Sequence, residues 1–268
     1  RSTLFPYTTL FRSSTENLWA LCAELKENCT FVELSHDLSP ETPHWSGFSP
    51  MSSETLFTYS DGFYVNKIEI VSQYGTHVDA PGHFIEGERM LHEIRAEELV
   101  LPLCVIDISE KAASDHDYSA TVQDIMDWEE KYGAIPEESF VALRTDWSKR
   151  EDLDNYDSEG NKHYPAWGLD AIKYLVEQRN VTAIGHETSD TDPAAVVTQI
   201  GFVGETYILQ MSRYQIELMK NLDKVPPAGA IIVSGFPKLV DGAGFSCRSF
   251  AIDRKSTRLN SSHSTESR

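Results

Sequence analysis

Short runs of strand-forming residues alternate with helical runs along most of the chain, which predicts a mixed α/β protein. Apolar residues recur at helical spacing in three segments, Val122–Tyr132, Leu169–Gln178 and Arg213–Leu222. No internal repeat or linker divides the chain, so we expect a single domain. The strand candidates are Phe31–Leu38, Phe63–Val71, Leu101–Ile108, Ser139–Thr145, Val181–Ile184, Ala230–Val233 and Phe245–Ile252.

Both ends of the chain differ from the part between them. Residues 1–13 begin without Met, and residues 255–268 are rich in Ser and Thr and show no apolar period. We expect both to be non-native tails and place the domain at 14–254. With 268 residues and 40% apolar content, the chain can bury one substantial core.

Charge and cysteine content narrow the class of protein. The formal net charge is −19 and basic residues do not cluster, which disfavours binding to nucleic acid. The apolar runs fall far short of a membrane span, so we expect no association with a membrane. Four scattered cysteines, Cys22, Cys29, Cys104 and Cys247, indicate reduced packing residues and a cytoplasmic protein.

The segment from Gln73 to Phe84 holds three side chains of the kind that bind metals: His77, Asp79 and His83. Pro81 excludes a regular helix here, so a strand that runs into a turn must present them. Residues i and i+2 of a strand share one face, which places His77 beside Asp79. This spacing suits two ligands of one metal, although turn-forming surface groups are equally consistent with it.

Imidazole together with carboxylate suits Zn²⁺ or Mn²⁺. A water at an open coordination position of such a metal loses its proton near neutral pH, and the resulting hydroxide attacks a carbonyl carbon. His83 lies past the turn and can take up this proton or deliver it to a leaving nitrogen. The segment therefore predicts one divalent metal, with His83 as the acid/base.

The pattern Gly-Thr-His-x-Asp-Ala-Pro-x-His-Phe over residues 75–84 resembles the hallmark of the cyclase family, which includes bacterial kynurenine formamidases and isatin hydrolases. Further resemblance lies in the stretch from Val32 to Pro50, in Ala142–Thr145, in Ile184–Pro193, and in the run from Ile216 to Pro226. Most of Phe31–Ile252 is covered. The family implies a mixed, barrel-like sheet flanked by helices, and a homodimer or higher homo-oligomer.

The resemblance also assigns roles to single residues. It implies that His77, Asp79 and Glu217 are metal ligands, that His83 is the proton donor and acceptor, and that Trp45 lines the substrate pocket. From the residues alone, Glu217 is equally consistent with a solvated helical side chain. Trp45 is equally consistent with a side chain that fills the core.

Two positions depart from the family pattern. Kynurenine formamidases with two zinc ions carry a His four residues before the motif His, where this chain has Gln73, and another His twelve residues before the Glu, where it has Glu205. An amide is a poor zinc ligand, whereas a carboxylate suits a harder metal such as Mn²⁺. Both remain weak candidate ligands. His186 is interpreted as a structural residue at a strand end.

These observations predict metal-dependent hydrolysis of a small (aryl)formamide or cyclic amide, most like that of N-formylkynurenine. One alternative is an isatin-type lactam hydrolase, since both reactions add hydroxide to an amide carbon and expel nitrogen. The other is an inactive metal-binding homologue. A purely structural site is expected to close its coordination sphere, so the spare His83 favours an enzyme.

Overall fold

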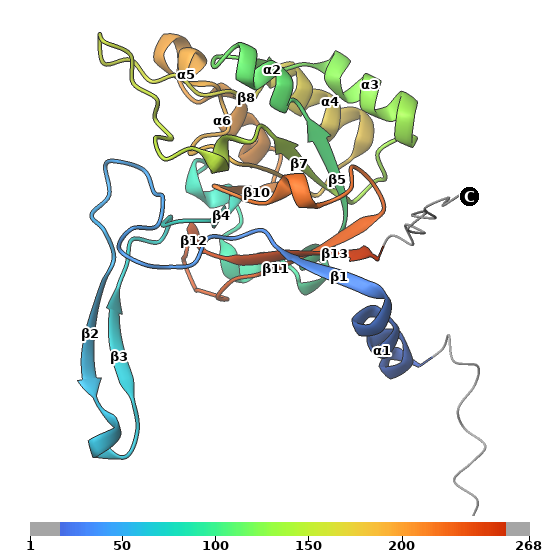
Figure 1. Ribbon diagram of the computed structural model, residues 1–268. Helices are drawn as coiled ribbons and strands as arrows, with labels where there is room; N and C mark the ends of the chain where they lie inside the picture. Colours follow the sequence, from blue (N-terminus) through green and yellow to red (C-terminus); the bar gives the residue numbers. More distant parts are fainter. Residues whose placement is uncertain (1–16, 256–268) are drawn as a thin grey trace, which may run out of the picture.

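The computed structural model describes residues 17–255 and shows the mixed α/β domain that the sequence predicts (Figure 1). The expected tails, 1–13 and 255–268, lie outside these residues apart from Lys255. The helices are α1 (Leu18–Asn28), α2 (Ser109–Ser114), α3 (Val122–Tyr132), α4 (Leu169–Arg179), α5 (Ala194–Ile200) and α6 (Val203–Gln210). The strands are β1 (Cys29–Glu33), β2 (Ser52–Phe57), β3 (Val65–Glu69), β4 (His77–Asp79), β5 (Val100–Asp107), β6 (Ser119–Ala120), β7 (Phe140–Arg144), β8 (Ala166–Trp167), β9 (Ala183–His186), β10 (Tyr214–Glu217), β11 (Ala230–Gly235), β12 (Gly244–Ser246) and β13 (Arg248–Arg254).

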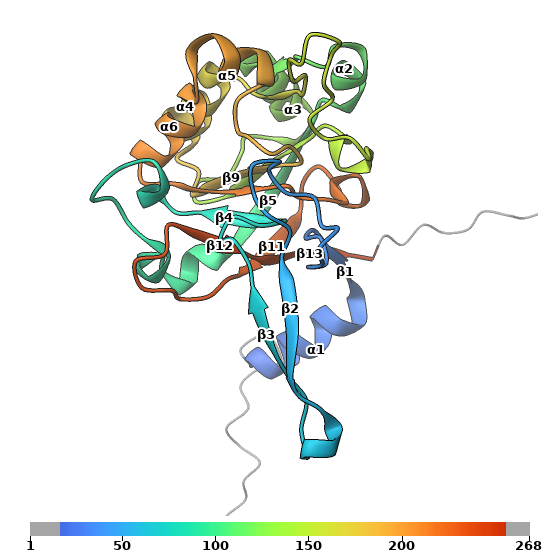
Figure 2. The same cartoon turned by 90° about the vertical axis from the view of Figure 1, so that its left-hand side faces the viewer.

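One nine-stranded sheet organises the domain, in the order β1-β13-β11-β5-β7-β9-β10-β4-β12. Strands β5, β7, β9 and β10 are parallel to one another, and the strands on both flanks join antiparallel. The sheet curls into a half-barrel, which confirms the mixed, barrel-like sheet. Helices α2–α6 lie on one side of it, whereas α1 and the β2–β3 hairpin lie on the other (Figures 1 and 2).

Two apolar clusters fill the two faces of this sheet. Leu103 and Val105 of β5 point into the curl, where they join one cluster with residues of β7, β10, β11 and β13. Cys104 and Ile106 point outward and pack under α3, α4 and α6. Alternate residues of a strand face opposite sides, so β5 is buried on both faces over this stretch. All four cysteines are free thiols.

The predictions of α3 and α4 are confirmed. Thr121 caps α3 through a hydrogen bond with the Asp124 backbone N–H, and Asn180 ends α4 in the left-handed conformation. Ile125 and Trp128 of α3 are buried beneath polar outer residues, as the helical spacing indicates. Segment 148–164 is without helix or strand apart from one short 3-10 turn at its start.

The predicted helix Arg213–Leu222 is wrong. Residues Tyr214–Glu217 form β10, which pairs with β9 on one side and β4 on the other. Tyr214 and Ile216 point into the inner cluster while Gln215 and Glu217 point outward, a period of two that pairing on both edges enforces. The backbone then turns at Leu218, with φ of 52°.

Other strand predictions hold with shifted limits. Candidate 31–38 overlaps β1 only up to Glu33, and candidate 63–71 contains β3, whose partner β2 was not predicted. Candidate 245–252 is split at Cys247 into β12 and β13, which pair with different strands. Over residues 17–255, no helix has the length and apolar character that crossing a membrane requires.

Close packing beneath β9 yields a testable prediction. A Cβ atom at Gly185 would lie 2.5 Å from Met219 Sδ and 2.6 Å from Phe140 Cζ, both in the buried core. We expect Gly185→Ala to lower the free energy of unfolding by about 1–3 kcal/mol, measured by urea denaturation. Gly235 of β11 is the matched control, because its nearest neighbour would be 3.7 Å away. Equal stability of the two variants would contradict this account.

Candidate metal centre

Strands β9, β10 and β4 bring polar side chains together on the outer face of the sheet. In each strand the alternate residues, such as Ile216 and Val78, face the inner cluster. Glu217 pairs across the strands with His77, and Gln215 pairs with Asp79. His186 of β9 lies next to Glu217 and so continues the row that His77 and Glu217 form across the sheet. The sheet register therefore turns scattered residues into one compact group.

The side-chain atoms of this group lie within a few ångströms of one another. His77 Nε2 is 3.4 Å from Asp79 Oδ2 and 3.5 Å from Glu217 Oε2. One ligand atom from each of the three falls within 4.8 Å of the others, and all three residues are buried. His77 Nδ1 lies 2.8 Å from the Gly75 carbonyl oxygen, which only accepts. The Nδ1 proton is therefore donated there, which leaves the Nε2 lone pair directed at the two carboxylates.

A second group shares Asp79 and adds His83 and Glu205, again with ligand atoms within 4.8 Å of one another. His83 Nε2 is 3.8 Å from Asp79 Oδ1. Pro81 begins a 3-10 turn that ends at His83 and leaves this side chain partly exposed at the rim, while Glu205 is buried in the first turn of α6. The structure therefore places the weak candidate Glu205 next to the motif residues.

Gln73, the other weak candidate, lies beside His83. Its amide Nε2 is 3.3 Å from His83 Nδ1. The contact holds the imidazole ring so that its other nitrogen, Nε2, faces Asp79. This contact gives Gln73 a role in orienting His83.

Buried carboxylates crowd the centre. Burial and the charges of Glu205 and Asp79 hold the pKa of Glu217 well above its usual range, and burial with the charge of Asp79 does the same for Glu205. Burial also raises the pKa of Asp190 to about 6 and lowers that of His186 to about 3. A bound cation would offset this concentration of negative charge.

The donor set fits a divalent metal. Asp79 Oδ1 is buried and, within residues 17–255, has no hydrogen-bond partner. Gly244 lies opposite Asp79 on β12, where a Cβ atom would come within 2.9 Å of that same oxygen. One imidazole with two or more carboxylates is a ligand set suited to Zn²⁺ or Mn²⁺. His77, Asp79 and Glu217 would hold such an ion.

An aromatic cavity of about 300 Å³ opens onto these residues. Trp45 and Phe48 form one wall, with ring centroids 5.0 Å apart. Phe84 and Phe202 form another, with centroids 5.7 Å apart. Trp45 is 46% exposed, so it lines this cavity and does not fill the core.

Reasoning from sequence missed Gln215 and set His186 aside. Gln215 Nε2 donates to Glu205 and Glu217 at 3.0 and 3.1 Å, and its Oε1 accepts from Thr191 at 2.6 Å. Its position two residues before Glu217 would have revealed it had β10 been recognised as a strand. His186 is fully buried, with Nε2 3.4 Å from Glu217 Oε1. This contact follows from the pairing of β9 with β10, which has no local sequence signal.

Comparison with known proteins places this arrangement in a family. The model of the family described as "Putative cyclase" matches residues 32–193, more than half of the chain. The chain belongs to the cyclase family. Its motif residues His77, Asp79 and His83 all fall within the matched range.

Relatives within the cyclase family differ in how much of the chain they match. An isatin hydrolase from Roseibium aggregatum is 30% identical over 85% of this chain and 88% of its own length. The solved isatin hydrolase A from Ralstonia solanacearum is 32% identical, with a TM-score of 0.82 over 92% of this chain and all of that one. A kynurenine formamidase from Bacillus anthracis is 30% identical, but only over 30% of this chain and 39% of that protein.

Proposed function

We propose that this member of the cyclase family hydrolyses a small, neutral, aromatic cyclic amide of the isatin type. The observation that carries the proposal is the similarity to an isatin hydrolase over 85% of the chain, compared with 81 residues for kynurenine formamidase. The first expectation, hydrolysis of N-formylkynurenine, becomes the second candidate. An inactive metal-binding homologue is the third.

The cavity supports a neutral substrate. Trp45, Phe48, Phe84 and Phe202 offer flat apolar surface on which an aromatic ring can stack. Among residues 17–255, the side chains that line the cavity include no lysine or arginine, while Asp190, Glu205 and Glu217 are acidic. N-formylkynurenine carries an α-ammonium group and an α-carboxylate, and the cavity offers no cationic side chain to that carboxylate, whereas isatin carries no charge.

The residues of the site divide the work of ring opening between them. A divalent ion held by His77, Asp79 and Glu217 would polarise the amide carbonyl and make a water more acidic. The water oxygen bonds to the carbonyl carbon, the C–N bond breaks, and one proton of the water passes to the leaving nitrogen. His83, whose Nε2 faces Asp79, would take up the proton that the water loses and deliver it to that nitrogen, and Gln73 contacts Nδ1 and holds the ring in place.

Steady-state kinetics of the metal-loaded protein with both substrates tests the proposal. We expect kcat/KM for isatin to exceed that for N-formylkynurenine by at least about 100-fold, because an unpaired charge placed in an apolar site costs several kcal/mol. Faster turnover of N-formylkynurenine would reverse the order of the first two candidates. A full complement of metal with turnover of neither substrate would favour the inactive homologue.

A further inference from the structure

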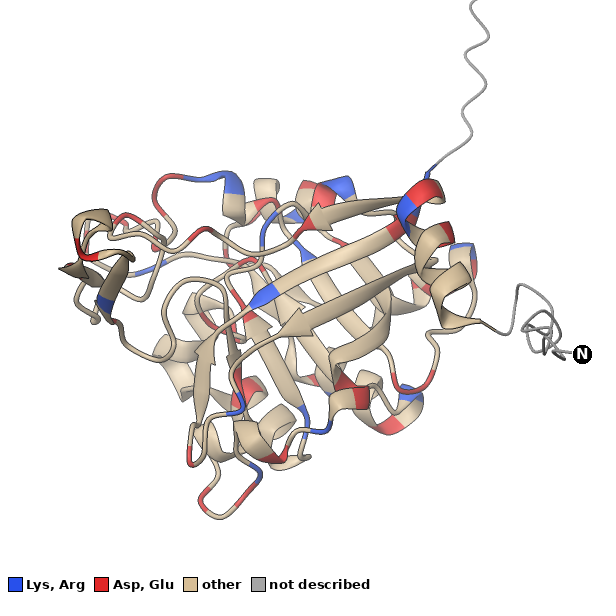
Figure 3. Ribbon diagram, turned by 90° about the horizontal axis from the view of Figure 1, so that it is seen from below, with Lys and Arg blue, Asp and Glu red and all other residues tan. Residues whose placement is uncertain are grey.

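One acidic side chain of the aromatic cavity, that of Asp190, belongs to neither group of candidate ligand atoms. It lies in the segment between β9 and α5 and is half-buried in the cavity wall, next to Ser189. Seen from below, most acidic residues of the protein lie around the edge of the sheet, in helices and loops (Figure 3). A carboxylate inside an aromatic cavity loses part of its hydration and needs other partners.

Within residues 17–255, only one of the two carboxylate oxygens of Asp190 has a hydrogen-bond partner. The Tyr164 hydroxyl donates to Oδ2, while Oδ1 receives no hydrogen bond from the residues that the structure describes. Oδ1 is accessible, since it is not one of the buried polar atoms that lack a partner. Each carboxylate oxygen can accept more than one hydrogen bond. An acceptor is therefore open to a molecule that occupies the cavity.

Tyr164 fixes the Asp190 carboxylate from behind. Its side chain is 2% exposed and packs with Trp147, Ala194 and Leu153. Burial and the charge of Asp190 hold the pKa of Tyr164 well above its usual range, so the hydroxyl keeps its proton and acts as the donor. The open oxygen is thus presented in a constant direction, which a group that selects a ligand requires.

The charge of Asp190 already has a cation nearby. Lys162, whose Nζ is 2.8 Å from Asp154 Oδ1, lowers the pKa of Asp190 through its positive charge. Burial outweighs this effect and raises the pKa to about 6, which still leaves the carboxylate ionised at pH 7. A charged substrate is therefore not needed to balance Asp190. The open oxygen needs a hydrogen-bond donor, and a neutral N–H group supplies one.

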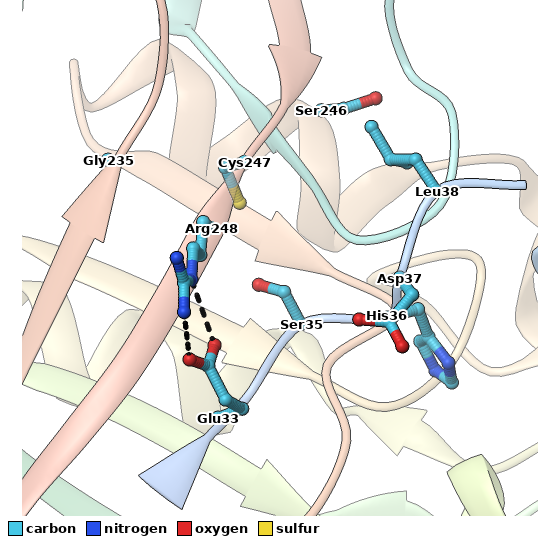
Figure 4. A pocket seen from close by; sticks show the side chains of 9 residues that line it. All are labelled: Glu33, Ser35, His36, Asp37, Leu38, Gly235, Ser246, Cys247 and Arg248. Carbon is cyan, nitrogen blue, oxygen red and sulfur yellow. Dashed lines mark hydrogen bonds and ion pairs between the residues drawn. The ribbon is translucent and has the colours of Figure 1, made fainter. Parts of the chain in front are cut away.

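A larger hollow of about 660 Å³ has no comparable group in its lining. Of its two acidic residues, Glu33 forms an ion pair with Arg248 (Figure 4), and Asp37 is exposed to water. Burial raises the pKa of Cys247 to about 12, so its thiol stays neutral. The aromatic cavity, in contrast, holds a carboxylate with one oxygen bound and the other open.

We propose that Asp190 accepts a hydrogen bond from the N–H group of the amide under attack, and so restricts the substrate to cyclic amides and anilides whose nitrogen carries a hydrogen. The role rests on the proposed function and adds a specificity-determining residue to it. Asp190 and His83 line the same cavity, so the amide nitrogen can meet both.

This contact becomes stronger during the reaction. The nitrogen keeps its own hydrogen, which stays bonded to Asp190, and gains a second one from His83 when the C–N bond breaks. A nitrogen that is being protonated is a stronger hydrogen-bond donor than a neutral amide. The negative carboxylate therefore stabilises the departing amine more than it stabilises the bound substrate, which lowers the barrier.

Steady-state kinetics with isatin and N-methylisatin tests this role. The two molecules share their ring and both carbonyl groups, but the second has no N–H group. We expect the metal-loaded parent protein to prefer isatin by at least about 100-fold in kcat/KM, because a site built to bind a substrate N–H group rejects an analogue that lacks it. 7-Methylisatin is the control for size, since it keeps the N–H group and carries its methyl group on the ring beside the nitrogen. It should react at least about 10-fold faster than N-methylisatin.

Asp190→Ala is expected to remove the preference. Its kcat/KM for isatin should fall by about 10²–10³-fold, whereas that for N-methylisatin should stay within about fivefold of the parent value. Metal content, measured by elemental analysis, should not change, because Asp190 lies outside both ligand groups. Asp127→Ala, which removes an exposed carboxylate from α3, is the matched control and should leave both values unchanged.

The substrate comparison needs the parent protein alone, so it holds even if the variant fails to fold. Equal rates with isatin and N-methylisatin, a preference that survives in Asp190→Ala, or loss of metal from a folded Asp190→Ala protein would each overturn the role of Asp190 and leave the proposed function standing. If N-formylkynurenine is the faster substrate, its formamide N–H group and the N-methylated form provide the same comparison. Turnover of neither substrate would overturn the proposed function and the role of Asp190 together.

Discussion

Asp79→Asn is expected to remove both the bound metal and the activity. Asp79 belongs to both groups of candidate ligand atoms, and its Oδ1 has no hydrogen-bond partner within residues 17–255. Asn keeps the size of the side chain but offers a neutral amide, a much poorer ligand for Zn²⁺ or Mn²⁺. We expect metal content, measured by elemental analysis, to fall from near one ion per chain to a small fraction. The value of kcat/KM should fall by at least about 10³-fold, or roughly 4 kcal/mol of transition-state stabilisation.

His83→Gln is the matched comparison for this prediction. His83 is the partly exposed member of the second group and is proposed to donate a proton, so its loss should lower kcat by about 10²–10⁴-fold. Metal held by His77, Asp79 and Glu217 should remain. If Asp79→Asn kept its metal, or if His83→Gln lost its metal as completely as Asp79→Asn, the assignment of ligands and proton donor would be wrong.

The parts of the fold that could be predicted are those whose signals are local. Helices α3 and α4 combine an apolar stripe with definite ends, Thr121 at the start of one and Asn180 at the end of the other. The strand at His77–Asp79 could be inferred because Pro81 excludes a helix. Strand β10 was misread because Tyr214, Ile216 and Leu218 fit either period, and only its neighbours on both edges decide the outcome.

In the candidate metal centre, too, only the contacts that have a local sequence signal could be predicted. His77 and Asp79 could be paired from their spacing because both belong to one strand. Gln215 and His186 meet them only through the register of β4 against β10 and of β10 against β9, which no local pattern encodes. Glu205 reaches the centre because Asp192 accepts hydrogen bonds from the Gly204 and Glu205 backbone N–H groups and so fixes the start of α6.

Without metal, the Glu217→Gln variant is expected to be more stable than the parent protein, by a margin that grows as pH rises. The same substitution is expected to weaken metal binding. Burial and the nearby Glu205 and Asp79 raise the pKa of Glu217, so the folded state binds a proton that the unfolded state has already released. Stability is then complete below the unfolded-state pKa and declines as pH rises towards the folded-state pKa, by up to about 1.4 kcal/mol per pH unit for one proton. Gln cannot ionise, so the variant escapes this loss.

Urea denaturation with chelator and with added metal, across roughly pH 5–8 where a carboxyl group of raised pKa changes its charge, measures both effects. Without metal, Glu217→Gln should be more stable than the parent, and the difference should widen with pH. Added metal should raise the free energy of unfolding of the parent protein more than that of the variant, since stabilisation by a ligand grows with its affinity.

Glu129→Gln is a control for which the opposite change in stability is expected. Arg179 lowers the pKa of Glu129 to about 2, so the stabilising effect of this carboxylate is present above the unfolded-state pKa and is lost as pH falls towards 2. Glu129→Gln should therefore be less stable than the parent in both conditions. A Glu217→Gln protein that is less stable than the parent without metal would show that Glu217 is a structural residue, stabilised by its hydrogen bonds and not by a cation.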